Sequence, residues 1–331
     1  MGVNSAPVAG LTPAAISERI ESRELSRRCA ILPEDVVRKV FRYGATAGRR
    51  IEQHVRLDRC MDRLQDLVVE AERRGEALAS GTVVMAAELG RGSGRFDRRW
   101  YAPPGGLWLA MAWADTLLPD FARLLPLAAG IACCETVRSY GIDAAIKWVN
   151  DIHVRGRKVC GILCQTVSAP GSGDRYHLIG IGINCNNKTF PAELRDTAVS
   201  MRDLLGRSLD LSQFALDLLV ALAWNFGLVH FQEECELASG GYPDKPESPV
   251  VAAWRQLSDT LGRQVVYGYD VRRQPLYRAA VLDIDHDGGL VMALEDGRRI
   301  TEYSGEILYL DGKPSQVPHF HAVTPARIEG L

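Results

Sequence analysis

The sequence predicts an α+β fold in two parts: a sheet of apolar strands with flanking helices, followed by a small antiparallel β-barrel. Between residues 51 and 257, short apolar runs typical of strands alternate with longer runs that have the helical period. From residue 264 onward only short strands remain, separated by the turn sequences DHDGG and EDG. This second pattern is typical of a compact barrel of about 50 residues.

The N-terminal region is expected to lie outside the sheet. Residues 1–17 are rich in Ala, Pro, Gly and Ser, so we expect a loose tail. Residues 18–43 have the pattern of two short helices. The second helix is expected to begin at Pro33, because Glu34 and Asp35 suit a first helical turn.

The middle of the chain alternates strands and helices. Residues 145–151 and 156–167 are expected to pair as a hairpin about Arg155–Gly156, and Gly141 is expected to end a long apolar helix. The remaining polar stretch at 238–249 is expected to be a loop. We expect strands at 51–57, 82–89, 107–113, 145–151, 156–167 and 177–185, and helices at 60–75, 121–140, 196–206, 211–231 and 250–262.

Composition and charge argue against several classes of protein. Apolar residues make up 47% and charged residues 24%, which is usual for a soluble globular chain. The net charge of −2 provides no basic surface for nucleic acid and no polybasic membrane anchor. No run of 18 apolar residues occurs, so we expect no membrane span and a cytoplasmic protein. The eight cysteines are expected to be buried free thiols, with no metal site.

A loop rich in glycine and arginine lies between two predicted strands at 90–100. Glycines at 90, 92 and 94 let the backbone approach a ligand closely. The arginines in this loop can bind carboxylate or phosphate groups through two parallel hydrogen bonds. The loop therefore favours an anionic, nucleotide-like ligand, and a solvated basic loop is the alternative.

Three later stretches place polar or glycine residues in apolar strands. A lysine, an asparagine and an aspartate occur together in KWVND at 147–151, where a simple turn is the alternative. Lys158 begins an apolar strand, so its ammonium must pair with an anion, face a cavity or reach water at the hairpin turn. The glycines of GIGIN at 180–184 indicate a close approach by a ligand or by another strand.

Taken in order, GSGRFDRRW, PPGGLWLAM, KWVND, GRKVCGIL and GIGIN, followed by a terminal SGEILYL, resemble the biotin–protein ligases. In that family the motifs read G-R-G-R-x-x-R-x-W, K-W-P-N-D, G-R-K-x-x-G-I-L and G-x-G-I-N. The resemblance implies a class II synthetase-like mixed sheet with flanking helices, followed by a small SH3-like β-barrel. It implies an N-terminal extension at 1–43, a biotin/lipoate ligase-like catalytic domain at 44–258, an SH3-like domain at 259–312 and a tail at 313–331.

The resemblance implies an ATP-dependent biotin–protein ligase, with ATP, Mg²⁺ and biotin as its cofactors and substrates. Biotin and MgATP would form biotinyl-5′-AMP and pyrophosphate, and a lysine of a biotin carboxyl carrier protein would then accept the biotin. Some family members also carry a DNA-binding winged helix. The short N-terminal region and the lack of a basic patch argue against nucleic-acid binding here. No membrane partner is expected, and a homodimer stays open.

The resemblance also implies roles for individual residues. Arg95 and Arg98 match the loop arginines that hold the adenylate and the ATP phosphates. Lys158 matches the lysine that contacts the biotin carboxylate, and Asp151 matches the aspartate near the attacking amine. Lys158, Asp151 and Arg95 are therefore the expected catalytic residues. Substrate and ATP are expected to be bound by Gly94, Arg95, Arg98, Trp100, Lys147, Asn150, Gly161, Leu163, Gly180, Gly182 and Asn184.

The sequence departs from the family pattern where biotin would bind. Residues 59–61 read Arg-Cys-Met in place of Ser-Thr-Asn, Leu89 replaces a glutamine, Ser93 replaces the first loop arginine, and Val149 replaces a proline. A site built to hydrogen-bond its ligand discriminates by those groups. Two alternatives therefore remain: a ligase for another carboxylic acid, such as lipoate or a related acyl group, and a non-catalytic ligand-binding paralogue.

Overall fold

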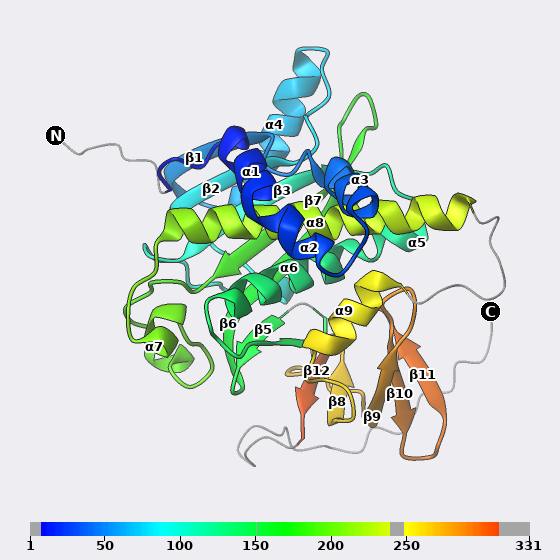
Figure 1. The fold of residues 1–331 in the computed structure, drawn as a ribbon. Coiled ribbons are helices and arrows are strands. Elements are labelled where there is room, and N and C mark those ends of the chain that lie inside the picture. The colour runs from blue at the N-terminus through cyan, green and yellow to red at the C-terminus, as the bar shows by residue number, and fades with distance from the viewer. Residues whose placement is uncertain (1–7, 150, 239–247, 311–331) are drawn as a thin grey trace.

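The computed structural model describes residues 8–149, 151–238 and 248–310, and Figure 1 gives the course of the chain. The expected tail at 313–331, the site candidate Asn150 and most of the expected loop at 238–249 lie outside the described residues. The predicted domain boundaries stay a prediction.

A mixed seven-stranded sheet forms the larger part of the fold, as expected. Its strand order is β1-β2-β3-β7-β6-β5-β4, in which β1 and β2 are parallel and every other neighbouring pair is antiparallel. The strands are β1 (Arg50–Leu57), β2 (Thr82–Leu89), β3 (Leu107–Ala114), β4 (Ala145–Lys147), β5 (Asp151–Val154), β6 (Arg157–Ser168) and β7 (Arg175–Ile183).

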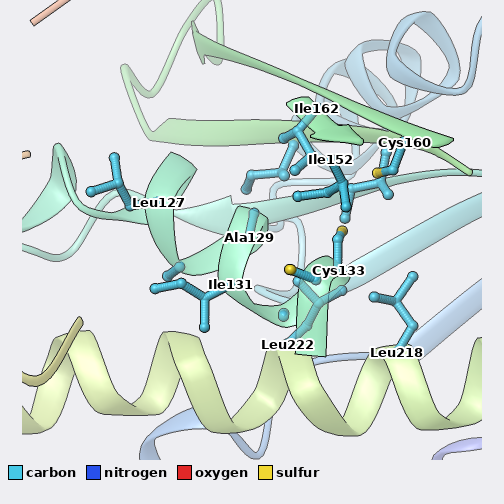
Figure 2. Packing of buried hydrophobic residues seen from close by; sticks show 14 of the residues in the cluster. Leu127, Ala129, Ile131, Cys133, Ile152, Cys160, Ile162, Leu218 and Leu222 are labelled. Carbon is cyan, nitrogen blue, oxygen red and sulfur yellow. The ribbon is translucent and has the colours of Figure 1, made fainter. Parts of the chain in front are cut away.

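Both faces of this sheet are buried, because successive side chains of a strand point to opposite faces. In β2, Val84 and Ala86 join a core with α4 (Cys60–Arg73), whereas Val83 and Met85 join a larger core on the other face. That larger core contains α6 (Leu125–Ser139) and α8 (Leu211–Ala238). In Figure 2, residues of α6 lie between residues of the sheet and residues of α8. The labelled residues are Leu127, Ala129, Ile131 and Cys133 of α6, Ile152, Cys160 and Ile162 of the sheet, and Leu218 and Leu222 of α8.

By length and composition α8 is apolar enough to cross a membrane. Its most apolar 18-residue window has a mean hydropathy of 1.6, and 78% of that window is buried inside the fold. Helix α8 corresponds to the helix expected at 211–231 and extends that helix to Ala238. Burial on nearly all sides explains its composition, since a helix that is hydrophobic all round is a core helix or a membrane span.

The N-terminal region is more ordered than its composition predicts. The expectation of a loose tail is wrong for 13–17, because α1 (Pro13–Arg19) begins there and buries Ile16. After a π-helical turn (Ile20–Glu24) come α2 (Leu25–Cys29) and α3 (Glu34–Gly44), which begins after Pro33 as expected. The helix α3 crosses α8 closely: a Cβ on Gly44 would lie 1.8 Å from the Ala223 carbonyl oxygen.

Three expected elements take a different form. Residues 145–151 form two strands, β4 and β5, that fold back on each other, so that Lys147 lies opposite Asp151. The helix expected at 196–206 is only α7 (Met201–Leu205), because Lys158 and Ala198 form a parallel bridge and Ser200 caps the helix. The helix expected at 121–140 is divided into α5 (Pro119–Ala122) and α6.

After α9 (Pro249–Leu257), the chain forms a second, five-stranded sheet. Its order is β11-β10-β9-β8-β12, antiparallel throughout, which is compatible with an SH3-like unit. Closure into a barrel is not found, because the edge strands β11 and β12 have no ladder between them in the described residues. The strands are β8 (Gln264–Gly268), β9 (Tyr277–Ile284), β10 (Leu290–Leu294), β11 (Arg299–Glu302) and β12 (Glu306–Tyr309).

All eight cysteines are free thiols, as expected. Five are buried, Cys29 and Cys164 are half-buried, and Cys235 is exposed, contrary to the expectation of burial throughout.

Candidate functional site

A cavity of about 380 Å³ lies between the two sheets. Its wall is formed by the loop at 92–101, the start of α4, strands β4 to β7, and the C-terminal unit around 271–272 and 305–308. All predicted site residues that the structure describes line this cavity. These are Gly94, Arg95, Arg98, Trp100, Lys147, Asp151, Lys158, Gly161, Leu163, Gly180, Gly182 and Asn184.

One row of paired residues across the sheet positions the polar end of the cavity. Lys147 of β4 pairs with Asp151 of β5, Asp151 pairs with Gly161 of β6, and Gly161 pairs with Gly182 of β7. Because directly opposite residues share one face of a sheet, all four lie on the cavity side. Two charged residues therefore stand beside two glycines, over which Lys158 and Trp100 pack directly.

Gly161, Gly180 and Gly182 form one wall of the cavity, called the glycine floor here, which consists of backbone alone. Cβ atoms added to Gly182 and Gly180 would lie 2.7 Å from Trp100 Nε1 and 2.7 Å from Met61 Sδ, respectively. Leu163 pairs with Gly180 in the next row of the ladder. The glycines thus let Trp100 and Met61 approach the backbone of β7 closely, so that these two side chains form part of the cavity lining.

A β-bulge turns Lys158 toward this floor. The register between β5 and β6 shifts next to His153, so that β6 holds an additional residue between Lys158 and Gly161. As a result, Lys158 Cε lies 2.9 Å from the Cβ position of Gly161, on the same face. Asn184 holds this backbone in place by donating from Nδ2 to the Lys158 carbonyl oxygen at 3.4 Å.

Lys158 and Asp151 form an ion pair in the cavity wall, with Nζ 2.6 Å from Oδ1. The same ammonium lies 5.2 Å from the centroid of the Trp100 ring. Burial by itself would raise the pKa of Asp151, but Lys158 and then Lys147 and Arg95 outweigh burial and hold that pKa below its usual value. Asp151 is therefore a carboxylate at neutral pH. It is the anionic partner that was one of the options expected for Lys158 from the sequence.

Lys147 is a second ammonium beside this pair. Its Nζ lies 5.1 Å from the centroid of the Tyr309 ring, and no carboxylate of the described residues lies within ion-pair distance. Burial lowers the pKa of Lys147, against the opposing effect of Asp151. A partly desolvated cation at this position favours an anionic ligand.

The glycine- and arginine-rich loop is held against the C-terminal unit. Arg95 donates from Nη1 to the Gly305 carbonyl oxygen at 2.7 Å, and burial lowers the pKa of Arg95. Arg98 donates to both oxygens of Glu306, at 2.7 and 2.8 Å, and also contacts Asp270. Both arginines thus lie at the cavity, and each donates to at least one acceptor of the C-terminal unit.

Sequence reasoning missed the acidic partners of the loop and a second network behind the site. His153 Nε2 lies 2.9 Å from Asp259 Oδ1, which also accepts from the Tyr309 hydroxyl at 2.8 Å. This network joins β5 to the C-terminal sheet beside Lys147 and Asp151. The only sequence signal was the SGE motif that contains Glu306. The described residues contain no group of three or more His, Cys, Asp or Glu that could hold a metal ion.

Comparisons with known proteins point to one family. The model of the biotin/lipoate A/B protein ligase family matches residues 59–186. The bifunctional ligase/repressor BirA of Bacillus spizizenii is 31% identical over 192 residues, which cover 54% of this chain and 59% of that protein. The biotin–[acetyl-CoA-carboxylase] ligase of Paracoccus denitrificans is 27% identical over 243 residues, which cover 70% of this chain and 92% of that protein. The chain therefore spans less than two thirds of the BirA relative.

A solved structure shares the fold. The biotin protein ligase from Aquifex aeolicus, in complex with biotin and ATP, superposes with a TM-score of 0.62 at 21% identity, over 79% of this chain and 98% of that chain. This likeness confirms the expected mixed sheet with flanking helices.

Proposed function

We propose that this chain is an ATP-dependent biotin–protein ligase of the biotin/lipoate A/B protein ligase family. The observation that supports this most strongly is the row Lys147, Asp151, Gly161 and Gly182, with Lys158 turned onto it by the bulge. This row places cations at one end of a glycine floor, where a carboxylate and a phosphate would meet.

In the first step of the proposed reaction, a biotin carboxylate oxygen attacks the α-phosphorus of ATP. A new P–O bond forms, the bond to the β-phosphate oxygen breaks, and pyrophosphate leaves. Two anions must approach each other, so cations positioned where charge develops lower the barrier. Lys158 would contact the carboxylate, while Arg95 and Arg98 would exchange their protein acceptors for the ATP phosphates.

In the second step, the amine of a carrier lysine attacks the acyl carbon, the bond to AMP breaks, and an amide forms. The attacking amine must be neutral, and a carboxylate can orient it and accept its proton. Asp151 suits the orienting part of this task, because the neighbouring cations keep it a carboxylate and its side chain lines the cavity. Its low pKa makes it a weak proton acceptor, so the proton passes on to solvent. The acceptor in this proposal is a biotin carboxyl carrier protein, and the name of the Paracoccus relative gives acetyl-CoA carboxylase as that enzyme's acceptor.

Mg²⁺ belongs to this proposal as the partner of ATP. Mg²⁺ usually keeps waters and substrate phosphates among its ligands and needs only one or two protein carboxylates. Glu306 and Asp151 are carboxylates in the lining that fit this role. Mg²⁺ would offset phosphate charge, and Lys147 would supply a further cation beside it.

The remaining expectations are part of the same proposal. A cytoplasmic location and the absence of a membrane partner suit an enzyme that needs ATP and a carrier protein. The BirA relatives are named ligase/repressors, whereas the charge of this chain is −2, so we propose no nucleic-acid partner. The homodimer stays a prediction.

The test is release of pyrophosphate by the purified chain with ATP, Mg²⁺ and biotin, followed by mass analysis for the adenylate. Transfer to a carrier domain is then read as a mass increase on its lysine. Lipoate is tested in parallel. Biotin-dependent release and transfer would support the proposal. Pyrophosphate release with lipoate but not with biotin would show that the substrate is another acid. No pyrophosphate release with either acid would contradict the ligase function.

A further inference from the structure

We propose that Tyr309 is a positioning residue for Lys147: its ring holds the Lys147 ammonium at the cavity without neutralising it, so that the charge remains available to a phosphate group of ATP. The proposal rests on the proposed ligase function. Tyr309 ends β12 in the C-terminal sheet, whereas Lys147 ends β4 in the larger sheet. Lys147 lines the cavity and Tyr309 lies outside the cavity wall, so the tyrosine reaches a ligand only through the lysine.

An aromatic ring holds Lys147 in a way that a carboxylate could not. The Lys147 Nζ lies 5.1 Å from the centroid of the Tyr309 ring, within the range of a cation–π contact. The face of a ring attracts a cation but carries no net charge, so the ammonium keeps its full charge for an anionic ligand. Lys158 is held differently, since its Nζ lies 2.6 Å from Asp151 Oδ1. Because a lysine stem is flexible, the ring contact decides where the Lys147 charge lies.

Residues 259–263, just before β8, fix the ring of Tyr309. Its hydroxyl donates to Asp259 Oδ1 at 2.8 Å and lies 2.8 Å from Thr260 Oγ1. A tyrosine hydroxyl has a single proton, so Thr260 is the donor in the second bond. Arg263 Cζ lies 4.5 Å from the centroid of the same ring, and Arg263 Nη2 lies 3.2 Å from Asp259 Oδ2. The ring is therefore held at its hydroxyl and over its face, and it offers the ammonium a fixed surface.

The backbone on both sides of Lys147 is bound to the same segment. Ser258 Oγ donates to the Ile146 carbonyl oxygen at 2.9 Å, and the Trp148 N–H donates to Thr260 Oγ1 at 3.1 Å. Ile146 and Ser258 also form a parallel bridge. Thr260 is fully buried, and its hydroxyl joins the Trp148 backbone directly to the tyrosine hydroxyl. One short segment between α9 and β8 therefore positions both the backbone and the ammonium of the lysine.

The first measurement is the KM for ATP in pyrophosphate release, with the biotin Kd from isothermal titration beside it. Tyr309→Leu removes the ring and is expected to raise the KM for ATP about 3- to 30-fold, through loss of one partly desolvated cation–π contact. Tyr309→Phe keeps the ring and is expected to stay within about twofold of wild type. The biotin Kd is expected to be unchanged in both variants, because Lys158 and not Lys147 is assigned to the biotin carboxylate.

The matched control is Tyr303→Leu, at an exposed tyrosine of the same unit. Its ring also faces a cation, with Arg123 Cζ 6.0 Å from the ring centroid, but neither residue lines the cavity. The KM for ATP of this variant is expected to equal that of wild type.

The second measurement shows whether the effect passes through Lys147. Lys147→Met removes the ammonium, and in this background Tyr309→Leu is expected to change the KM for ATP less than about twofold. Fluorinated phenylalanines in place of Tyr309 keep the shape of the ring while weakening its attraction for cations. The KM for ATP is therefore expected to rise with each added fluorine. These shape-conserving variants also decide the question if Tyr309→Leu does not fold.

Four results would overturn the inference: a wild-type KM for ATP in Tyr309→Leu, equal losses in Tyr309→Leu and Tyr309→Phe, an undiminished effect in the Lys147→Met background, or a KM that ignores fluorination. A biotin Kd that rises as much as the KM for ATP would also overturn it, since both ligands weaken when the fold is disturbed. The ligase function fails separately. Wild type that releases no pyrophosphate overturns that function, while titration of wild type and Tyr309→Leu with ATP still decides the contact.

Discussion

Arg98 and Glu306, which are 208 residues apart, form a two-pronged ion pair across the mouth of the cavity. The pair fastens the glycine- and arginine-rich loop to the start of β12, and Asp270 adds a second acidic contact to the same guanidinium. An ATP phosphate that binds Arg98 must displace these carboxylates. In the proposed reaction, the C-terminal unit would therefore compete with ATP for this arginine.

The first prediction concerns the balance between stability and ligand binding at this pair. Arg98→Ala is expected to change the free energy of unfolding by about 1 kcal/mol or less, because partly exposed ion pairs contribute little. It is expected to raise the KM for ATP about tenfold or more, since a bidentate phosphate contact is lost. Thermal melts and pyrophosphate kinetics measure the two effects. Arg91→Ala, at an exposed arginine of the same loop, is the control. A large melting shift without a KM effect would assign Arg98 a purely structural role.

Lys158→Ala tests the cation at the reacting carboxylate. Pyrophosphate release with biotin is expected to fall at least about 100-fold, as it does when a donor is removed from a developing charge. The fold is expected to remain, because the partner Asp151 is 36% exposed and can be hydrated. Arg157→Ala, one residue earlier and exposed at the hairpin, is the matched control. Turnover of Lys158→Ala at the wild-type rate would remove Lys158 from the mechanism.

The candidate residues named from the motif order line one cavity, because many of them come from a few neighbouring strands. Glycine, lysine and aspartate at fixed positions in β4 to β7 fall into one row when the strands pair. Local patterns also located nearly every helix and strand. The single strand expected at 145–151 is replaced by β4 and β5, and the turn that KWVND offered as an alternative fits this reversal.

Long-range pairing is what the sequence could not reveal. The partners Arg98–Glu306 and His153–Asp259 are separated by 208 and 106 residues, and no spacing rule joins them. The N-terminal error has a similar cause. Ile16 and its neighbours read as a weak, Ala- and Pro-rich segment, and they form a helix because α8 offers them an apolar surface. Tertiary packing overrides local propensity at such sites.

The lowered pKa of Asp151 leads us to expect that the stability of the fold depends on pH. Its pKa is lower in the folded protein than in the unfolded chain, so its contribution is complete above the unfolded value of about 3.9. The contribution is lost as the pH falls through the lower, folded value. Asp151→Asn is therefore expected to lose less stability than wild type on acidification below about pH 4, measured by urea unfolding at each pH. Asp143→Asn removes a fully exposed carboxylate and is the control. If the free energy of unfolding fell equally with pH below about 4 in wild type and in Asp151→Asn, the ion-pair environment of Asp151 would be contradicted.

The crossing of α3 and α8 yields a prediction with an internal control. A Cβ at Gly44 would lie 1.8 Å from the Ala223 carbonyl oxygen, a backbone atom that cannot move without shifting α8. Gly44→Ala is therefore expected to reduce the free energy of unfolding by about 1–3 kcal/mol. Gly130→Ala, inside α6, has its nearest neighbour at 3.9 Å, the Ile162 Cδ1. There the added methyl group is expected to stabilise the helix by about 0.5–1 kcal/mol. Urea unfolding measures the free energy of unfolding of both variants. Equal changes for Gly44→Ala and Gly130→Ala would mean that α3 and α8 do not pack as closely as described.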